Sequence, residues 1–372
     1  MSGLARPEDD VNAVVAAYLR DLAFVQSSRQ KTFGYKRAAA AVASFDTPLP
    51  EFVKAGGEPT KIHGIGPASA RVIREVLERA SSPSVERAID ESGHREEIER
   101  RRGLRRHFLS RAEVLRVLST APANAPGKDD YRGDLQMHSE WSDGSATLSH
   151  IRRACQERGY EYAAITDHSH GLRIAGGMSM ADAAAQRKAI LKANSRPAGG
   201  CQLLQGIEAN IGTDGRLDLS DSEARTFELV LAAPHSRLRK GDDQTARMIA
   251  AVEHPAVRIL AHPRGRMAGS RAGIVARWDE VFARAAVLGV AIEIDGDPAR
   301  QDLDYTLARK AYDAGCLFAL DSDAHTTAQL AYAETALAHA ILAGVDRERV
   351  VNCWPLARLL AWIADPAREA LR

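Results

Sequence analysis

Seven short apolar runs dominate the chain after residue 130, and each contains or ends in a histidine or a carboxylate. In order they read RGDLQMHS, YAAITDHS, QLLQGIEANI, LVLAAPHS, VRILAHP, VAIEIDG and LFALDSDAH. Because strand-like runs that alternate with helical stretches indicate parallel strands, we expect an α/β fold, a parallel α/β barrel. An open doubly wound sheet is the alternative. It is disfavoured because no glycine-rich phosphate loop follows the first run.

Residues with metal-binding side chains are concentrated at the ends of these runs. In a parallel barrel the carboxyl ends of the strands meet on one face, where active sites lie. Residues two apart on a strand share a side, which pairs Gln136 with His138 and Asp323 with His325. A single histidine after a strand is usually a local capping or packing residue, but seven such runs in succession are hard to obtain by accident. The further candidates are Asp143, Asp167, His168, Glu208, His235, His262, Glu293 and Asp295.

Mixed imidazole and carboxylate ligands favour Zn²⁺, Mn²⁺ or Fe²⁺ over Mg²⁺, which prefers oxygen ligands alone. We therefore expect two to three divalent transition metals per chain. Several cations follow the same strands and are candidates for binding a substrate phosphate, although each could equally be a solvated loop charge. They are Arg173, Arg237, Lys240, Arg264 and Arg266, of which we rank Arg237 and Arg264 as catalytic candidates beside Glu208 and Asp167.

The ordered segments GDLQMHSEWSDG, ITDHS, GIEANIGTDGRLD, PHSR, LAHPRGR, IEIDG and SDAH resemble the polymerase-and-histidinol-phosphatase (PHP) domain. They look closest to the version carried by bacterial family X DNA polymerases. The resemblance implies a distorted (β/α)7 TIM-like barrel with a three-metal site, in which Asp167 orients a ligand. One metal would take Gln136, His138, Glu208 and Asp323; a second Glu208, His235 and His262; a third Asp143, His168 and His325.

One position departs from that family. Its first motif is commonly His-x-His, whereas this chain has Gln136 before His138. An amide oxygen is a weaker ligand than imidazole for these metals. The substitution therefore leaves the occupancy of the first metal position open.

The first 86 residues have helical periodicity and are predicted to form an all-α helix-hairpin-helix domain. In KIHGIGPASARVIREVL, Gly64 and Gly66 permit a tight turn whose backbone N–H groups can face a phosphate. With FGYKRAAAAVASF upstream, the segment resembles the N-terminal DNA-binding domain of family X polymerases. The candidate DNA contacts are Lys36, Arg37, Lys61, Gly64, Gly66 and Arg71. A purely structural helical cap is the alternative.

Residues 87–130 are expected to form a basic helical stretch and a linker, and residues 131–372 the phosphoesterase domain. The interval between the outer domains is too short for a polymerase palm. The net charge of only +1 means that any basic surface must be local.

Three functions remain open at this point. The first is a metal-dependent phosphoesterase of DNA repair that acts on DNA ends as a 3′–5′ exonuclease or 3′-phosphatase. The second is a small-molecule phosphatase of the histidinol-phosphatase type. The third is a catalytically weak DNA-binding accessory protein, favoured if Gln136 empties a metal position.

The expected partners are DNA and a phosphate-bearing substrate, with no membrane. The N-terminus has no apolar core of a signal peptide, and the four scattered cysteines indicate a reducing, cytoplasmic location. The oligomeric state is left open.

Overall fold

The computed structural model describes residues 10–195 and 200–365. These residues form two compact units: one contains the chain up to Thr120 together with residues 268–270, and the other contains residues 121–267 and 271 onward. Residues 87–120 therefore fold with the helices that precede them. The finer subdivision at residues 86 and 130 stays a prediction.

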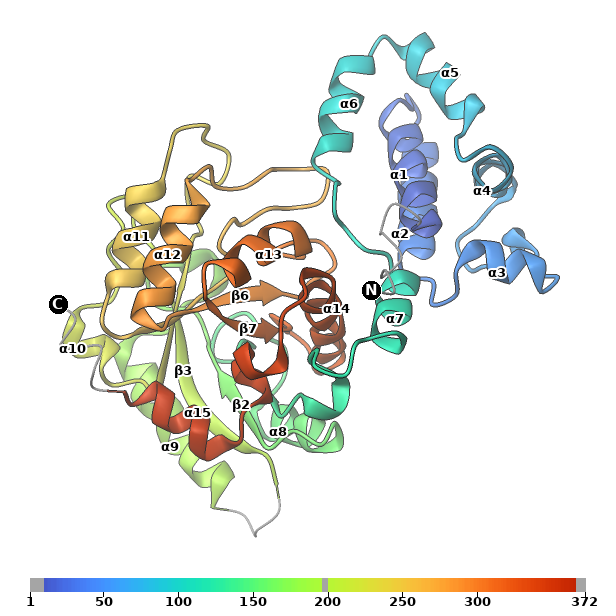
Figure 1. Ribbon diagram of the computed structural model, residues 1–372. Coiled ribbons are helices and arrows are strands. Elements are labelled where there is room, and N and C mark those ends of the chain that lie inside the picture. The colour runs from blue at the N-terminus through green and yellow to red at the C-terminus, as the bar shows by residue number, and fades with distance from the viewer. Residues whose placement is uncertain (1–9, 196–199, 366–372) are drawn as a thin grey trace. The chain divides into compact units, whose positions relative to one another are not determined.

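The first unit is entirely helical, as its periodicity predicts (Figure 1). Its helices are α1 (Val11–Phe24), α2 (Arg29–Ala43), α3 (Leu49–Lys54), η2 (Pro59–Lys61), α4 (Pro67–Arg79), α5 (Pro83–Ser92), α6 (Arg95–Gly103) and α7 (Arg111–Ser119). Apolar faces of α1, α2 and α4 meet in a core that includes Val15, Leu19 and Ile73. The turn before α4 contains Gly64 at φ +88°, a left-handed conformation that favours glycine.

The second unit is a barrel of seven parallel strands in sequence order, so the predicted fold class is confirmed. The strands are β1 (Gly133–Asp134), β2 (Tyr162–Ile165), β3 (Gln202–Asn210), β4 (Leu229–Ala233), β5 (Val257–Leu260), β6 (Ala291–Asp295) and β7 (Leu317–Asp321). An isolated parallel bridge between Met137 and Ala324 connects the first and last strands beyond their ends. Because each strand rises in the same direction, the loops that follow the strands all open on one rim.

Helices cover the outside of the barrel and close its base (Figure 1). They are α8 (Leu148–Glu157), α9 (Met180–Asn194), α10 (Asp221–Ala224), α11 (Thr245–Glu253), α12 (Trp278–Leu288), α13 (Tyr305–Asp313), α14 (Ala333–Ala343) and α15 (Leu356–Ile363). Short 3₁₀ turns are η3 (Lys128–Asp130), η4 (Arg173–Ala175), η5 (Thr327–Tyr332), η6 (Arg347–Arg349) and η7 (Val351–Cys353). Trp354 and Leu359 pack against buried strand residues such as Leu204 and Ile259, so the lower half of the barrel is a filled apolar core.

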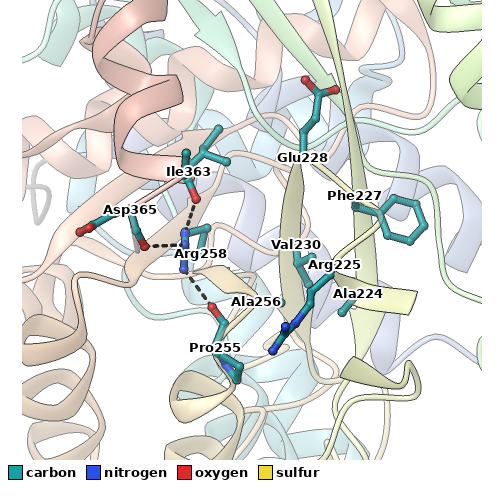
Figure 2. Close-up of a pocket in the computed structure, with 11 residues that line it drawn as sticks. Ala224, Arg225, Phe227, Glu228, Val230, Pro255, Ala256, Arg258, Ile363 and Asp365 are labelled. Carbon is teal, nitrogen blue, oxygen red and sulfur yellow. Dashed lines mark hydrogen bonds between the residues drawn. The ribbon is translucent and has the colours of Figure 1, made fainter. Parts of the chain in front are cut away.

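A cavity of about 370 Å³ lies at the base of the barrel, away from the rim (Figure 2). Its buried cation, Arg258, donates hydrogen bonds to the carbonyls of Pro255, Ile363 and Asp365. These contacts tie the end of α15 to the barrel wall. The guanidinium of Arg258 is thus engaged by backbone carbonyls. In the described part of the chain, no helix is long and apolar enough to cross a membrane.

Candidate metal centre

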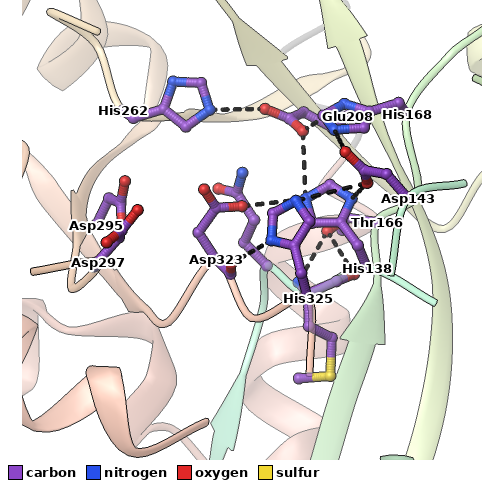
Figure 3. Close-up of polar contacts among 12 residues, drawn as sticks. His138, Asp143, Thr166, His168, Glu208, His262, Asp295, Asp297, Asp323 and His325 are labelled. Carbon is purple, nitrogen blue, oxygen red and sulfur yellow. Dashed lines mark hydrogen bonds and ion pairs between the residues drawn. The ribbon is translucent and has the colours of Figure 1, made fainter. Parts of the chain in front are cut away.

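The rim of the barrel gathers the predicted ligands around one fully buried carboxylate, Glu208 on β3 (Figure 3). Its Oε1 lies 2.7 Å from His262 Nε2 and 3.4 Å from His235 Nε2. Its Oε2 lies 2.9 Å from His168 Nδ1 and 3.5 Å from His138 Nε2. Four imidazoles from four different strand ends thus face one carboxylate, which confirms that these distant motifs converge on one site.

A second carboxylate, Asp143, lies in the loop after β1 and faces the other nitrogens of two of these histidines, His138 and His168, together with His325. Its oxygens lie 3.5 Å from His168 Nε2 and 3.5 Å from His325 Nε2. The ring of His138 stacks between those of His168 and His325, with ring centroids 4.3 and 4.4 Å away. The ligand atoms fall into two groups that share His168, and in each the ligand atoms lie within 4.8 Å of one another: group A is His138, Asp143, His168 and His325; group B is His168, Glu208 and His235.

Asp323 and Gln136 are two further predicted ligands, and both are buried. Asp323 Oδ1 lies 3.1 Å from His138 Nε2. Both polar atoms of the Gln136 amide are buried and have no hydrogen-bond partner among the described residues. A buried amide without a partner carries a desolvation cost, which a bound cation would offset through the amide oxygen. These residues therefore fit divalent metals, and their individual ligand roles stay a prediction.

The carboxylates and the imidazoles of the site shift each other's pKa values. Burial opposes ionisation of Glu208, but the facing imidazoles His168 and His235 hold the pKa of Glu208 well below its usual range. Conversely, burial disfavours protonated His168, yet the charges of Glu208 and Asp143 outweigh it and raise the pKa of His168 to about 10. Contacts with Asp143 and Asp323 likewise outweigh burial and raise the pKa of His325 to about 9. Protons and metal ions compete for these same ligand atoms.

Two residues of the site have strained backbone conformations. His262 has φ +26° and Asp323 has φ +49°, a region that residues other than glycine rarely occupy and that is typical of functional sites. The N–H of His262 donates to Glu293 Oε2, which helps to hold the strained turn. Glu293 is buried, and burial together with the charge of Asp321 raises its pKa well above the usual range.

Asp167 organises the loop that carries Asp143 rather than contacting a histidine. Its carboxylate accepts hydrogen bonds from Ser139 N at 2.8 Å, from the hydroxyls of Ser139 and Ser142, and from Gln186 Nε2 at 2.6 Å. This arrangement is compatible with an orienting role and leaves that role a prediction.

The predicted phosphate-binding cations are mostly engaged elsewhere. Arg237 donates to Asp242, and Arg264 donates to Asp304 and to the Ala272 carbonyl. Arg266 is buried and also bonds Asp304. The exposed residues Arg173 and Lys240 lie on loops after β2 and β4. Catalytic roles for Arg237 and Arg264 stay predictions.

Sequence reasoning missed three residues near the site. Arg300 follows β6, and its Nη1 lies 3.3 Å from Asp323 Oδ2, with one fifth of its side chain exposed. Asn210, two residues after Glu208, lies 2.5 Å from His235 through its Oδ1, and Asp218 bonds Asn210 in turn. Strand alternation could have identified Asn210. Arg300 and Asp218 depend on loop conformations that periodicity does not indicate.

The candidate DNA contacts all lie in the helical unit. Lys36 and Arg37 are exposed on α2, and Lys61 is exposed at the end of η2. A side-chain carbon on Gly64 would lie 3.5 Å from Arg37 Cγ, so α2 runs beside the glycine turn. Gly66 is the N-cap of α4, and Arg71 is an exposed residue of that helix.

Comparison with known proteins agrees with this geometry. Residues 134–261 match the sequence profile of the PHP domain. The DNA polymerase/3′-5′ exonuclease PolX of Bacillus subtilis (strain 168) is 33% identical over 233 residues, which are 62% of this chain and 41% of that protein. The chain thus matches less than half of that relative's length.

Other relatives match over most of their own length. A protein named "Probable phosphatase" from Enterobacter sp. (strain 638) is 29% identical across 60% of this chain and 91% of that protein. The solved histidinol phosphate phosphatase of Lactococcus lactis, complexed with zinc, L-histidinol and phosphate, covers 56% of this chain and 92% of its own, at 14% identity and a TM-score of 0.41.

We predict that Glu208→Gln lowers the metal content by at least one ion per chain. The amide removes the one negative charge that four imidazoles face while keeping the size of the side chain. Elemental analysis of protein equilibrated with Mn²⁺ measures the loss. Glu157→Gln, an exposed position on α8, is the matched control and should retain the wild-type content. Equal metal content in a folded Glu208→Gln variant would contradict the site.

Proposed function

We propose that this PHP-domain chain is a metal-dependent phosphoesterase that acts on DNA ends, as a 3′–5′ exonuclease or a 3′-phosphatase. The convergence of four imidazoles on buried Glu208 is the observation that carries the proposal. Divalent ions of the Mn²⁺, Zn²⁺ or Fe²⁺ type, two to three per chain, would supply activated water near neutral pH and positive charge for phosphoryl oxygens. The ligands would be those predicted from the sequence.

Arg300 is the cation best placed to meet a substrate phosphate. Its guanidinium faces three carboxylates: Nη1 lies 3.3 Å from Asp323 Oδ2, and Nε lies 3.8 Å from Asp295 Oδ2 and 3.9 Å from Asp297 Oδ2. Its own carbonyl accepts from Arg266 Nε at 3.0 Å, and its N–H donates to Asp297 O at 2.8 Å. The backbone is therefore fixed while the planar guanidinium keeps donors for bidentate contact with phosphate oxygens.

The helical unit supports DNA as the substrate. No ion pair or hydrogen bond from the side chains of Lys36, Arg37 or Lys61 is found within residues 10–195 and 200–365. The first turn of α4 has backbone N–H groups without intrahelical partners, and Arg37 lies beside the Gly64 turn that precedes this helix. Phe33, one turn before Arg37 on α2, is 67% exposed. Cations next to an exposed aromatic ring are typical of surfaces that bind single strands.

A small-molecule phosphatase is the second candidate, because proteins named as probable phosphatases match over 84 to 91% of their length. The helical unit would then be structural. The two candidates share the metal centre and differ in the size of the substrate.

We predict that the full chain with Mn²⁺ releases mononucleotides or phosphate from the 3′ ends of DNA. A labelled oligonucleotide ending in 3′-OH and one ending in 3′-phosphate separate exonuclease from phosphatase activity. Glu208→Gln supplies the background rate of any contaminating nuclease. Hydrolysis of histidinol phosphate with no action on either oligonucleotide would overturn the DNA-end proposal in favour of the second candidate.

We predict that the triple variant Lys36→Ala, Arg37→Ala, Lys61→Ala binds DNA more weakly and with less salt dependence. Each cation that no longer neutralises a phosphate should lower the slope of log K against log salt by about 0.7 to 0.9, because fewer counterions are released. Fluorescence anisotropy at several salt concentrations measures both quantities, and hydrolysis of a small phosphate ester should persist.

The charge-matched control removes Arg158, Lys188 and Lys192, which are exposed on the barrel unit. If both triple variants bind DNA with the same affinity and slope, the proposed role of the helical unit is wrong.

A further inference from the structure

Asp218, in the loop after β3, is a hydrogen-bond hub behind group B. Its Oδ1 accepts from Asn210 N at 2.9 Å, and its Oδ2 accepts from Asn210 Nδ2 at 2.7 Å and from Gly171 N at 3.0 Å. Ser169 Oγ lies 2.8 and 2.7 Å from the two oxygens. A side-chain carbon on Gly171 would lie 2.0 Å from Asp218 Oδ2. The close approach therefore requires glycine there.

The hydrogen bonds of Asp218 involve residues that lie next to, or contact, each member of group B. Ser169 follows His168 directly, and Asn210 lies two residues after Glu208 on the same strand. Asn210 Oδ1 lies 2.5 Å from Nδ1 of the third member, His235. One carboxylate thus connects the backbones or side chains next to all three candidate ligands.

The hub also determines which nitrogen of His235 carries the proton. A carboxylate only accepts hydrogen bonds, so the NH₂ group of Asn210 must face Asp218 and its carbonyl oxygen must face His235. Flipping the amide would place two oxygens 2.7 Å apart in a half-buried position. Because Asn210 Oδ1 can only accept, Nδ1 of His235 must be the donor. In the neutral ring, the form that can bind a cation, the free electron pair is then on Nε2, which lies 3.4 Å from Glu208 Oε1.

We propose that Asn210 and Asp218 are positioning residues that set the tautomer and ring direction of His235 for a cation held by group B. The inference rests on the proposed metal-dependent function and adds how one ligand is prepared. Neither residue touches the cation or the substrate. Hydrogen bonds of this kind to a ligating imidazole fix its orientation and raise its basicity.

The first test replaces Asn210 by alanine in the full chain. Long-range ¹H–¹⁵N NMR of the protein before metal addition should show His235 protonated at Nδ1 in the wild type and a mixture of tautomers in Asn210→Ala. Chelator competition with Zn²⁺ should show affinity for one ion reduced about 10- to 100-fold, with group A unchanged.

The matched control is Asn194→Ala, at the last residue of α9, whose side chain contacts the opposite end of β3. Asn194 also bridges backbone groups, through Leu203 N at 2.9 Å and Leu203 O at 2.8 Å, but contacts no candidate ligand among the described residues. It should retain both the tautomer and the wild-type metal affinity. If Asn210→Ala and Asn194→Ala lower metal affinity equally, the effect is general loosening of β3 and the proposal is overturned.

A charge swap keeps the proposal testable even if Asn210→Ala perturbs folding. Asn210→Asp alone sets two carboxylates against each other and should weaken metal binding. Adding Asp218→Asn restores an amide–carboxylate pair and leaves an acceptor for His235, although the new NH₂ group also meets the Gly171 N–H, so the double variant should recover part of the affinity lost in Asn210→Asp. No recovery would overturn the proposal. A wild-type protein that binds no metal would instead remove the proposed function, while the tautomer measurement would still test the hub.

Discussion

The buried negative charge of Glu208 is the constraint around which the barrel rim is arranged. A carboxylate without solvent exposure is costly unless positive or donating groups surround it. Four strand ends supply imidazoles to its two oxygens, and Asp143 faces the opposite nitrogens of two of these rings, His138 and His168. The resulting cluster has more ligand atoms than internal hydrogen bonds can satisfy, which is the electrostatic basis for a metal centre.

The surrounding fold holds this cluster in place by means that are independent of the ligands themselves. The apolar lower half of the barrel, closed by Trp354 and Leu359, fixes the strands. Asp167 ties the loop that carries Asp143, and Asp218 ties the loop after His168. Positive φ angles at His262 and Asp323 show that local backbone strain is tolerated at the site. Rigid supporting contacts of this kind maintain the geometry that chemistry requires.

The strands and the converging ligands could be predicted because both depend on local sequence. Apolar runs ending in His138, His168 or His235 indicate strand ends, and parallel strand ends must meet. The positions of the cations were harder to predict from the sequence, because the loop conformation determines where a long side chain points. Arg264 lies two residues after His262 in the sequence, yet its guanidinium pairs with Asp304. Arg300, which no strand pattern indicates, lies beside Asp323.

Crystals of the full chain soaked in Mn²⁺ would test the metal centre most directly, by anomalous diffraction at the manganese edge. We expect at least two anomalous peaks on the rim of the barrel, one among His168, Glu208 and His235 and one beside Asp143. A saturated crystal with no peak within ligand distance of Glu208 would contradict the metal-dependent function.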